Sequence, residues 1–165
     1  MRWTAAFILS AALSAPSAIG AAGTTRVAHN YAERIGHAWV QRAIETAAAR
    51  LALAECQKVF TDFVTADRVP LSRVLAELKT TPEDYLTQGI WFMEGDREPQ
   101  CRGRDIAAFT EKGSRVIYVC SSRVTAQYIT DGDLIVIHEM LHSLGLGENP
   151  PTSAQITKAV WARCR

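Results

Sequence analysis

The sequence predicts an α+β fold, in which helices pack on one face of a small, mostly antiparallel sheet. Three observations indicate this class. A long alanine-rich segment with helical periodicity comes first, short segments rich in β-branched and aromatic residues occupy the middle, and an almost wholly apolar helix containing two histidines follows. The resulting order of helix, strand, short helices, strand, hairpin, helix, turn and short helix is typical of an α+β protein.

Residues 1–22 are expected to be a secretory signal peptide. Arg2 supplies the positive start, residues 5–15 form a short apolar core, and Gly20-Ala21-Ala22 is a small-residue cleavage site. A buried N-terminal helix is the alternative, and Pro16 argues against it. We therefore expect an exported protein.

Residues 23–165 are then expected to form a single domain, long enough to bury a core. Without Arg2 this part has 17 basic and 17 acidic residues, so its balanced charge does not favour nucleic acid or an anionic membrane surface. After the signal, no segment approaches the ~20 apolar residues of a membrane span. We expect a secreted or periplasmic monomer.

The four cysteines all follow the expected signal, and no C-x-x-C pair suggests a metal or redox site. In an exported protein this favours two disulfides over free thiols. Three pairings are possible. We favour Cys101 with Cys120, because the segment between them should fold back on itself, which leaves Cys56 with Cys164.

The first half of the domain begins with a helix expected from Val27 to Glu55, where apolar residues keep a helical period. Val59–Val64 alternates partly and is rich in β-formers, so it is expected to be the first strand. After a turn near Asp67–Pro70, a short helix is expected over Ser72–Lys79. Thr81-Pro82-Glu83-Asp84 then predicts a helix start, with a cap, a proline and acids in the first turn.

The second half continues with a strand over Ile90–Met93, after Gly89 ends the preceding helix. Residues 94–104 are polar and contain glycine, which predicts a surface loop. Ile106–Thr110 and Arg115–Cys120 are expected to be two strands joined by a four-residue hairpin turn.

The apolar helix is predicted to follow Asp131 and Asp133, whose side chains offer N-cap oxygens. Gly145 is placed to end it in a left-handed conformation. A helix that is apolar nearly all round belongs in an interior, where buried histidines need partners. After the prolines at 150 and 151, Ser153 is expected to cap a last helix near 154–162.

His138-Glu139-Met140-Leu141-His142 gives the pattern H-E-x-x-H. Residues four apart share a helix face, so His138 and His142 can place two imidazoles on one cation. Glu139 lies about 100° round from His138, close enough to reach a metal-bound water without ligating the metal. Zinc lowers the pKa of such a water to about 7, and the carboxylate can take its proton. The alternative is that both histidines are hydrogen-bonded core residues.

The run from His138 to Glu148 resembles the extended signature of the zincin metallopeptidases, in particular the metzincin form H-E-x-x-H-x-x-G-x-x-(H/D). The resemblance implies that His138 and His142 are zinc ligands, Glu139 the catalytic base and Gly145 the helix terminator. The third-ligand position holds Glu148 instead of His or Asp, and no later methionine offers a Met-turn. The run also resembles short exported bacterial proteins that carry the same site.

The resemblance further implies a zincin-like minimal catalytic domain, in which an edge strand lines the cleft. A strand between Ile106 and Cys120 would then hold a peptide by backbone hydrogen bonds. Only 17 residues follow Glu148, which leaves little material for a lower wall to that cleft.

Glu148 is the predicted third protein ligand, because catalytic zinc uses three protein ligands and one water. After His142, the only acidic, histidine or cysteine side chains are Glu148 and Cys164, and Cys164 is already assigned to a disulfide. The alternative is that His29 or His37 completes the site.

The sequence thus predicts an exported Zn²⁺-dependent peptidase acting on a peptide or protein substrate, with Glu139 moving the proton to the leaving amine. Two alternatives remain: a binding or structural module that holds zinc without turnover, and a metal-free disulfide-stapled domain. Structural zinc prefers closed, cysteine-rich sets of four ligands, which the sequence does not offer. Tyr118 and Tyr128 are candidate oxyanion donors on residue type alone.

Overall fold

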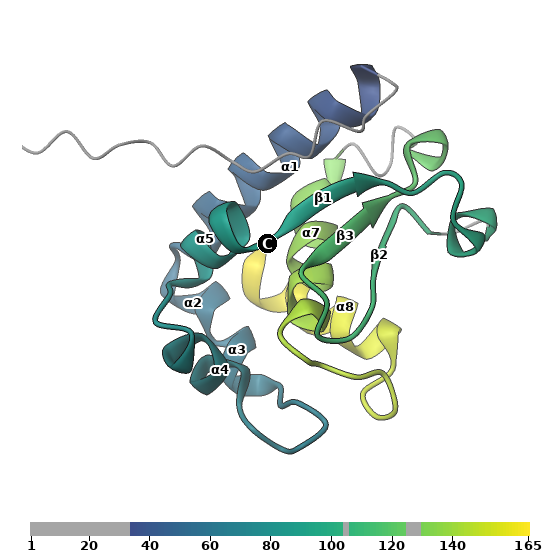
Figure 1. Ribbon diagram of the computed structural model, residues 1–165. Coiled ribbons are helices and arrows are strands. Elements are labelled where there is room, and N and C mark those ends of the chain that lie inside the picture. Colours follow the sequence, from purple (N-terminus) through teal and green to yellow (C-terminus); the bar gives the residue numbers. More distant parts are fainter. Residues whose placement is uncertain (1–33, 104–105, 125–129) are drawn as a thin grey trace, which may run out of the picture.

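Figure 1 shows the computed structural model. It describes residues 34–103, 106–124 and 130–165, and residues 34–37 by their backbone alone. The expected signal peptide, residues 1–22, lies outside the described residues. The described elements are α1 (Arg34–Leu51), α2 (Ala54–Gln57), α3 (Val59–Asp62), α4 (Leu71–Glu77), α5 (Pro82–Asp84), η1 (Tyr85–Gly89), β1 (Trp91–Glu94), η2 (Pro99–Arg102), β2 (Ala108–Thr110), β3 (Val116–Val119), η3 (Ser121–Arg123), α7 (Gly132–Ser143) and α8 (Ser153–Cys164). This is the predicted α+β class.

The described strands form one three-stranded sheet in the order β1-β3-β2. β2 and β3 pair antiparallel, with Phe109 opposite Tyr118, as the predicted hairpin requires. β1, however, pairs parallel with β3, with Phe92 opposite Ile117, so the sheet is mixed instead of mostly antiparallel. The last strand inserts between the first two, and a local sequence pattern carries no information on such a long-range pairing order.

Helix α7 lies at the centre of the molecule. It packs against β2 and β3 of the sheet, while α1 and α8 pack against it from other sides (Figure 1). Of its twelve residues only Ile135 is not fully buried, which follows from its almost continuous apolar sequence. Gly132 permits the close approach of α1, because a Cβ there would lie 2.9 Å from the indole of Trp39. The prediction of an interior helix is confirmed.

The C-terminal end of α7 is fixed by backbone hydrogen bonds around Gly145, which has a φ of 103°. The N–H of Gly145 donates to the carbonyl of His142 at 2.9 Å, and the N–H of Leu146 donates to that of Leu141 at 3.1 Å. This pair of bonds satisfies the last helix carbonyls and favours glycine at the left-handed position. The predicted role of Gly145 is confirmed, and the chain turns sharply toward Glu148.

The predicted first strand, Val59–Val64, is wrong: Val59–Asp62 is helix α3, and Val64 makes only an isolated bridge with Pro70. Val59 and Phe60 are buried, and tertiary packing of these apolar side chains overrides the β propensity of the segment. The long first helix ends at Leu51, whose carbonyl accepts a hydrogen bond from Nε2 of Gln57 at 3.0 Å.

Two predicted helix starts differ in outcome. Thr81 caps α5 as expected, because its hydroxyl accepts from the N–H of Asp84 at 3.1 Å. The last helix is capped by Thr152, not by Ser153: Thr152 and Gln155 each accept a hydrogen bond from the backbone N–H of the other. This reciprocal pair satisfies two free N–H groups, which a serine one position later would not do.

Asp131 occupies the N-cap of α7, but its side chain makes no capping hydrogen bond, contrary to the prediction for that side chain. Asp133, the second predicted acid, accepts from the N–H of Leu134 at 2.9 Å. It also pairs with Arg50 of α1, which in turn donates to the carbonyl of Cys164. These contacts join the start of α7 to both neighbouring helices.

Both predicted disulfides are present: Cys56 pairs with Cys164 and Cys101 with Cys120. The first joins α2 to the last residue of α8, and Arg163 adds an ion pair with Asp62 at 2.8 Å. Helix α8 is therefore held against the helical part of the molecule. Among the described residues, no helix is long and apolar enough to cross a membrane.

Candidate metal centre

Three predicted ligands come together at the end of α7. Nε2 of His138 lies 3.1 Å from Nε2 of His142, and Oε1 of Glu148 lies 3.2 Å from the same His142 nitrogen. One nitrogen or oxygen atom from each residue lies within 4.8 Å of the other two. This group of two imidazoles and a carboxylate can hold a metal ion.

Each imidazole is also oriented through its other nitrogen. Nδ1 of His142 lies 2.9 Å from the carbonyl oxygen of Leu146, and because a carbonyl only accepts, the proton is on Nδ1 and Nε2 carries the lone pair. Nδ1 of His138 lies 3.1 Å from the hydroxyl of Thr157 on α8, which can accept the same kind of bond. The contacts present both Nε2 atoms as ligands.

Thr157 was not anticipated from the sequence. It lies 19 residues after His138 on a separate helix, and no local spacing pattern links the two. The sequence indicates this contact only indirectly, because the predicted pairing of Cys56 with Cys164 ties the last helix to the body of the protein.

Burial lowers the pKa of His138 to about 4, and the neighbouring charge of His142 acts in the same direction. The His138 side chain is therefore neutral near pH 7. A neutral imidazole is the form that binds a metal.

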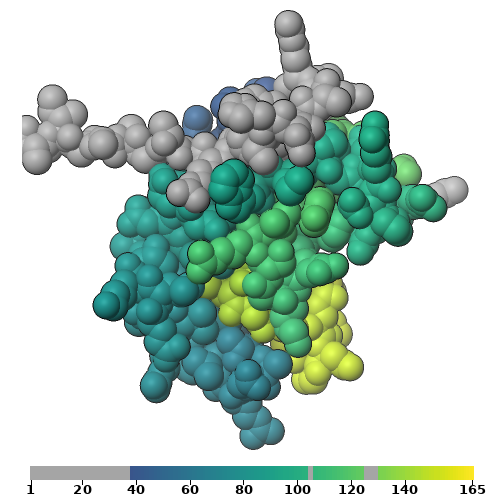
Figure 2. Space-filling view, viewed as in Figure 1, coloured from purple at the N-terminus to yellow at the C-terminus, as the bar shows by residue number. Residues whose placement is uncertain are grey.

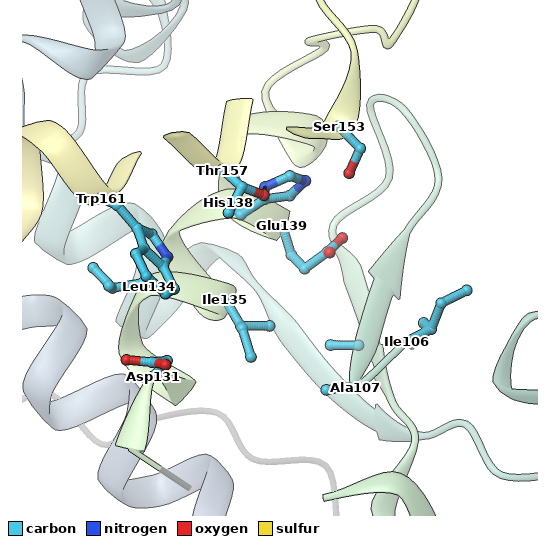
Figure 3. A pocket seen from close by; sticks show the side chains of 11 residues that line it. Ile106, Ala107, Asp131, Leu134, Ile135, His138, Glu139, Ser153, Thr157 and Trp161 are labelled. Carbon is cyan, nitrogen blue, oxygen red and sulfur yellow. Dashed lines mark hydrogen bonds between the residues drawn. The ribbon is translucent and has the colours of Figure 1, made fainter. Parts of the chain in front are cut away.

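Glu139 follows His138 on α7, and its side chain points away from the His138 imidazole, toward the space between α7 and β2 (Figure 3). Burial raises its pKa to about 8, and the negative charge of Glu148 adds to the shift. Thr110 on β2 opposes the shift, although its hydroxyl completes no hydrogen bond with a described residue. A carboxyl group with this pKa can both hold and release a proton near neutral pH.

A cavity of about 290 Å³ opens next to Glu139. Its walls come from the segment entering β2, from α7 and from α8 (Figure 3). The wall opposite β2 consists of Ser153, Thr157 and Trp161. The short C-terminal helix α8 therefore folds back beside α7 and supplies one wall of this cavity.

A second hollow, of about 800 Å³, borders Glu148. It lies between residues 62–68, which begin at the last residue of α3, and residues 147–151, which follow α7. Lys112 of the β2–β3 turn also lines it. In the space-filling view the yellow C-terminal part emerges between the teal helical part and the green hairpin (Figure 2). The ligand group therefore borders both hollows, through His138 in the first and Glu148 in the second.

The remaining predicted residues have mixed outcomes. His29 lies outside the described residues, as does the side chain of His37, so neither joins the described ligand group. Tyr118 stacks on Phe109 with 5.0 Å between ring centroids, and Tyr128 also lies outside the described residues. An oxyanion donor is therefore not identified.

Comparisons with protein-family models, with curated proteins and with solved structures give no match for this chain. The assignment of a function therefore rests on the chemistry of the site.

Proposed function

We propose that this protein is an exported zinc-dependent metallopeptidase with a zincin-like catalytic site. His138, His142 and Glu148 hold the zinc, and Glu139 is the general base in the hydrolysis of a peptide bond. The observation that carries this proposal is the gathering of three ligand atoms within 4.8 Å, next to a buried carboxyl group that takes no part in the ligand set.

Zinc fits the donor set better than the common hard cations. Magnesium and calcium prefer oxygen ligands, whereas two imidazoles suit zinc and its transition-metal neighbours. Two histidines with one glutamate form an established catalytic set for zinc. In a tetrahedral site with bonds of about 2.0–2.1 Å, neighbouring ligand atoms are about 3.3 Å apart. The separations of 3.1 and 3.2 Å around His142 are close to that value.

Zinc held there would act as a Lewis acid that lowers the pKa of a coordinated water to about 7 and polarises a substrate carbonyl. Glu139 takes the proton of the attacking water and gives it to the leaving amine. Leu146 and Thr157 keep the imidazoles in place.

The competing function is a module that holds zinc for structure or binding and has no turnover. Two features favour the enzyme. Structural zinc prefers four protein ligands, whereas three residues form the described group. The side chain of Glu148 is 52% exposed and the cavity beside Glu139 is open, so water and a substrate can reach the site.

The proposed location is secreted or periplasmic. Disulfides persist in oxidising compartments and are rare in the cytosol, and all four cysteines are paired. The expected signal peptide agrees with this location.

The direct test is metal analysis of the exported, mature protein, followed by digestion of a peptide library read by mass spectrometry. We expect about one zinc per chain and cleavage that stops on chelation and returns with zinc. Stoichiometric zinc with no cleavage of any peptide would support the structural module instead.

A further inference from the structure

We propose that the hollow beside Glu148 binds a carboxylate of the substrate, through Lys112 and Arg68. The peptidase would then prefer peptides that carry a negative charge on one side of the scissile bond. This inference rests on the proposed function and assigns a substrate class to it.

The position of the hollow makes it a place for substrate. It borders Glu148, the third member of the ligand group, so a peptide held at the metal extends directly into it. Its volume of about 800 Å³ is within the roughly 300–1,000 Å³ of ordinary ligand sites. The loops on its two sides, residues 62–68 and 147–151, both lie at the lower end of the view in Figure 1.

Lys112 is held near the metal ligands by the fold. The next residue, Gly113, donates its N–H to the carbonyl of His142 at 2.9 Å, which ties the hairpin turn to the end of α7. A Cβ on Gly147 would lie 3.8 Å from Cδ of Lys112. The lysine stem therefore lies across Gly147, immediately before Glu148.

The hollow is lined by two acidic side chains, Asp62 and Glu148, and by two basic ones, Arg68 and Lys112, and the two acidic ones have partners of their own. The carboxylate of Asp62 is paired with Arg163 at 2.8 Å, and that of Glu148 is a ligand of the proposed zinc site. Within the part of the chain that the structure describes, neither Arg68 nor Lys112 forms an ion pair. Two cations in one hollow favour a carboxylate, to which both donate charge-assisted hydrogen bonds.

The cavity next to Glu139 differs from this hollow in the charges of its lining residues. The described residues that line it include Asp131 and Glu139 and no lysine or arginine. The described residues there offer a carboxylate no cationic partner, so the preference for an acidic substrate belongs to the Glu148 side of the site.

Such a carboxylate has two sources: an acidic side chain within the peptide, or the C-terminal carboxylate of the peptide itself. Four alanine-rich pentapeptides separate them. Two contain one glutamate and two contain glutamine in its place, and each pair is made with a free and with an amidated C-terminus.

Binding is measured by calorimetry on zinc-loaded Glu139→Gln protein, so that no turnover is needed. We expect peptides with the preferred carboxylate to bind about tenfold more tightly than neutral ones, and the advantage to fall at high salt. Lys112→Met and Arg68→Gln should each remove most of this difference. Lys158→Met, at an exposed helix position outside the hollow, should leave it unchanged.

An acidic preference that survives in the double variant Lys112→Met/Arg68→Gln overturns the assignment, as does equal binding of all four peptides to the parent protein. Charge reversal gives a second check, because Lys112→Glu should turn the preference toward a peptide with lysine in place of glutamate. Cleavage of the library without any acidic bias would refute this inference and leave the proposed function intact. Selective binding of the acidic peptides without cleavage of any peptide would refute the proposed function and leave this inference intact.

Discussion

The hydroxyl of Thr157 lies 3.1 Å from Nδ1 of His138, so the last helix of the protein contacts the first residue of the H-E-x-x-H motif. The same helix supplies one wall of the cavity next to Glu139 and ends in the disulfide that joins it to α2. The candidate metal centre thus depends on two helices, although the sequence motif lies wholly in one of them.

Thr157→Val should weaken zinc binding, because the valine keeps the shape of the side chain and removes the oxygen that orients His138. The loss expected for such a supporting contact is about 10–100-fold in zinc affinity. Thr157→Ser retains the hydroxyl and should bind zinc nearly as the parent does. Competition with a zinc chelator measures all three proteins, and equal affinities for parent and valine variant would count against this role.

Removal of the disulfide between Cys56 and Cys164, by serine at both positions, should lower the free energy of unfolding by about 2–5 kcal/mol. It should also weaken zinc binding, because α8 carries Thr157. The bridge between Cys101 and Cys120 is the matched control, since it is far from α8 in the sequence and closes a shorter loop. If both double variants lose zinc affinity to the same degree, the coupling through α8 is wrong.

The metal-free protein should be stabilised by Glu139→Gln, by an amount that depends on pH. Burial raises the pKa of Glu139 from 4.5 to about 8, so between these values the folded state holds a proton that the unfolded state has lost. The stability of the parent therefore falls as pH rises from 4.5 to 8, on the order of a few kcal/mol, whereas the glutamine variant has no such loss. Urea unfolding from pH 4 to 9 measures this, and a pH-independent difference would contradict it.

Glu148→Ala should lower zinc affinity far more than His29→Ala or His37→Ala. The carboxylate is one of three ligand atoms in the described group, and an open site depends on each of its few ligands. Zinc titration of the three variants decides between the two assignments. If Glu148→Ala binds zinc as tightly as the parent and either histidine variant does not, the third ligand is a histidine in the N-terminal part of the chain.

The sequence was most informative where one segment carries the whole signal. The H-E-x-x-H spacing and the glycine at 145 predict a helix, its end and two histidines on one face within eight residues, and the structure has all three. Glu148 follows from the same run, because the turn after Gly145 leaves few other donors within reach.

Some features that depend on distant packing were not predicted, although the pairing of Cys56 with Cys164 was. Val59–Asp62 has β-forming residues but lies next to a disulfide and buries Val59 in a helical core. The insertion of β3 beside β1 and the contact of Thr157 with His138 join residues far apart in the chain. In each case the structure depends on which surfaces pack together, and the local propensity of a segment does not determine that.

The central claim is tested most directly by Glu139→Gln, with zinc content and peptide hydrolysis measured on the same sample. The glutamine side chain is uncharged and unable to take a proton, while His138, His142 and Glu148 remain in place. The account predicts about one zinc per chain, as in the parent, and a loss of hydrolysis of about 100-fold or more, the contribution expected of a general base. Hydrolysis at the parental rate with zinc still bound would contradict it.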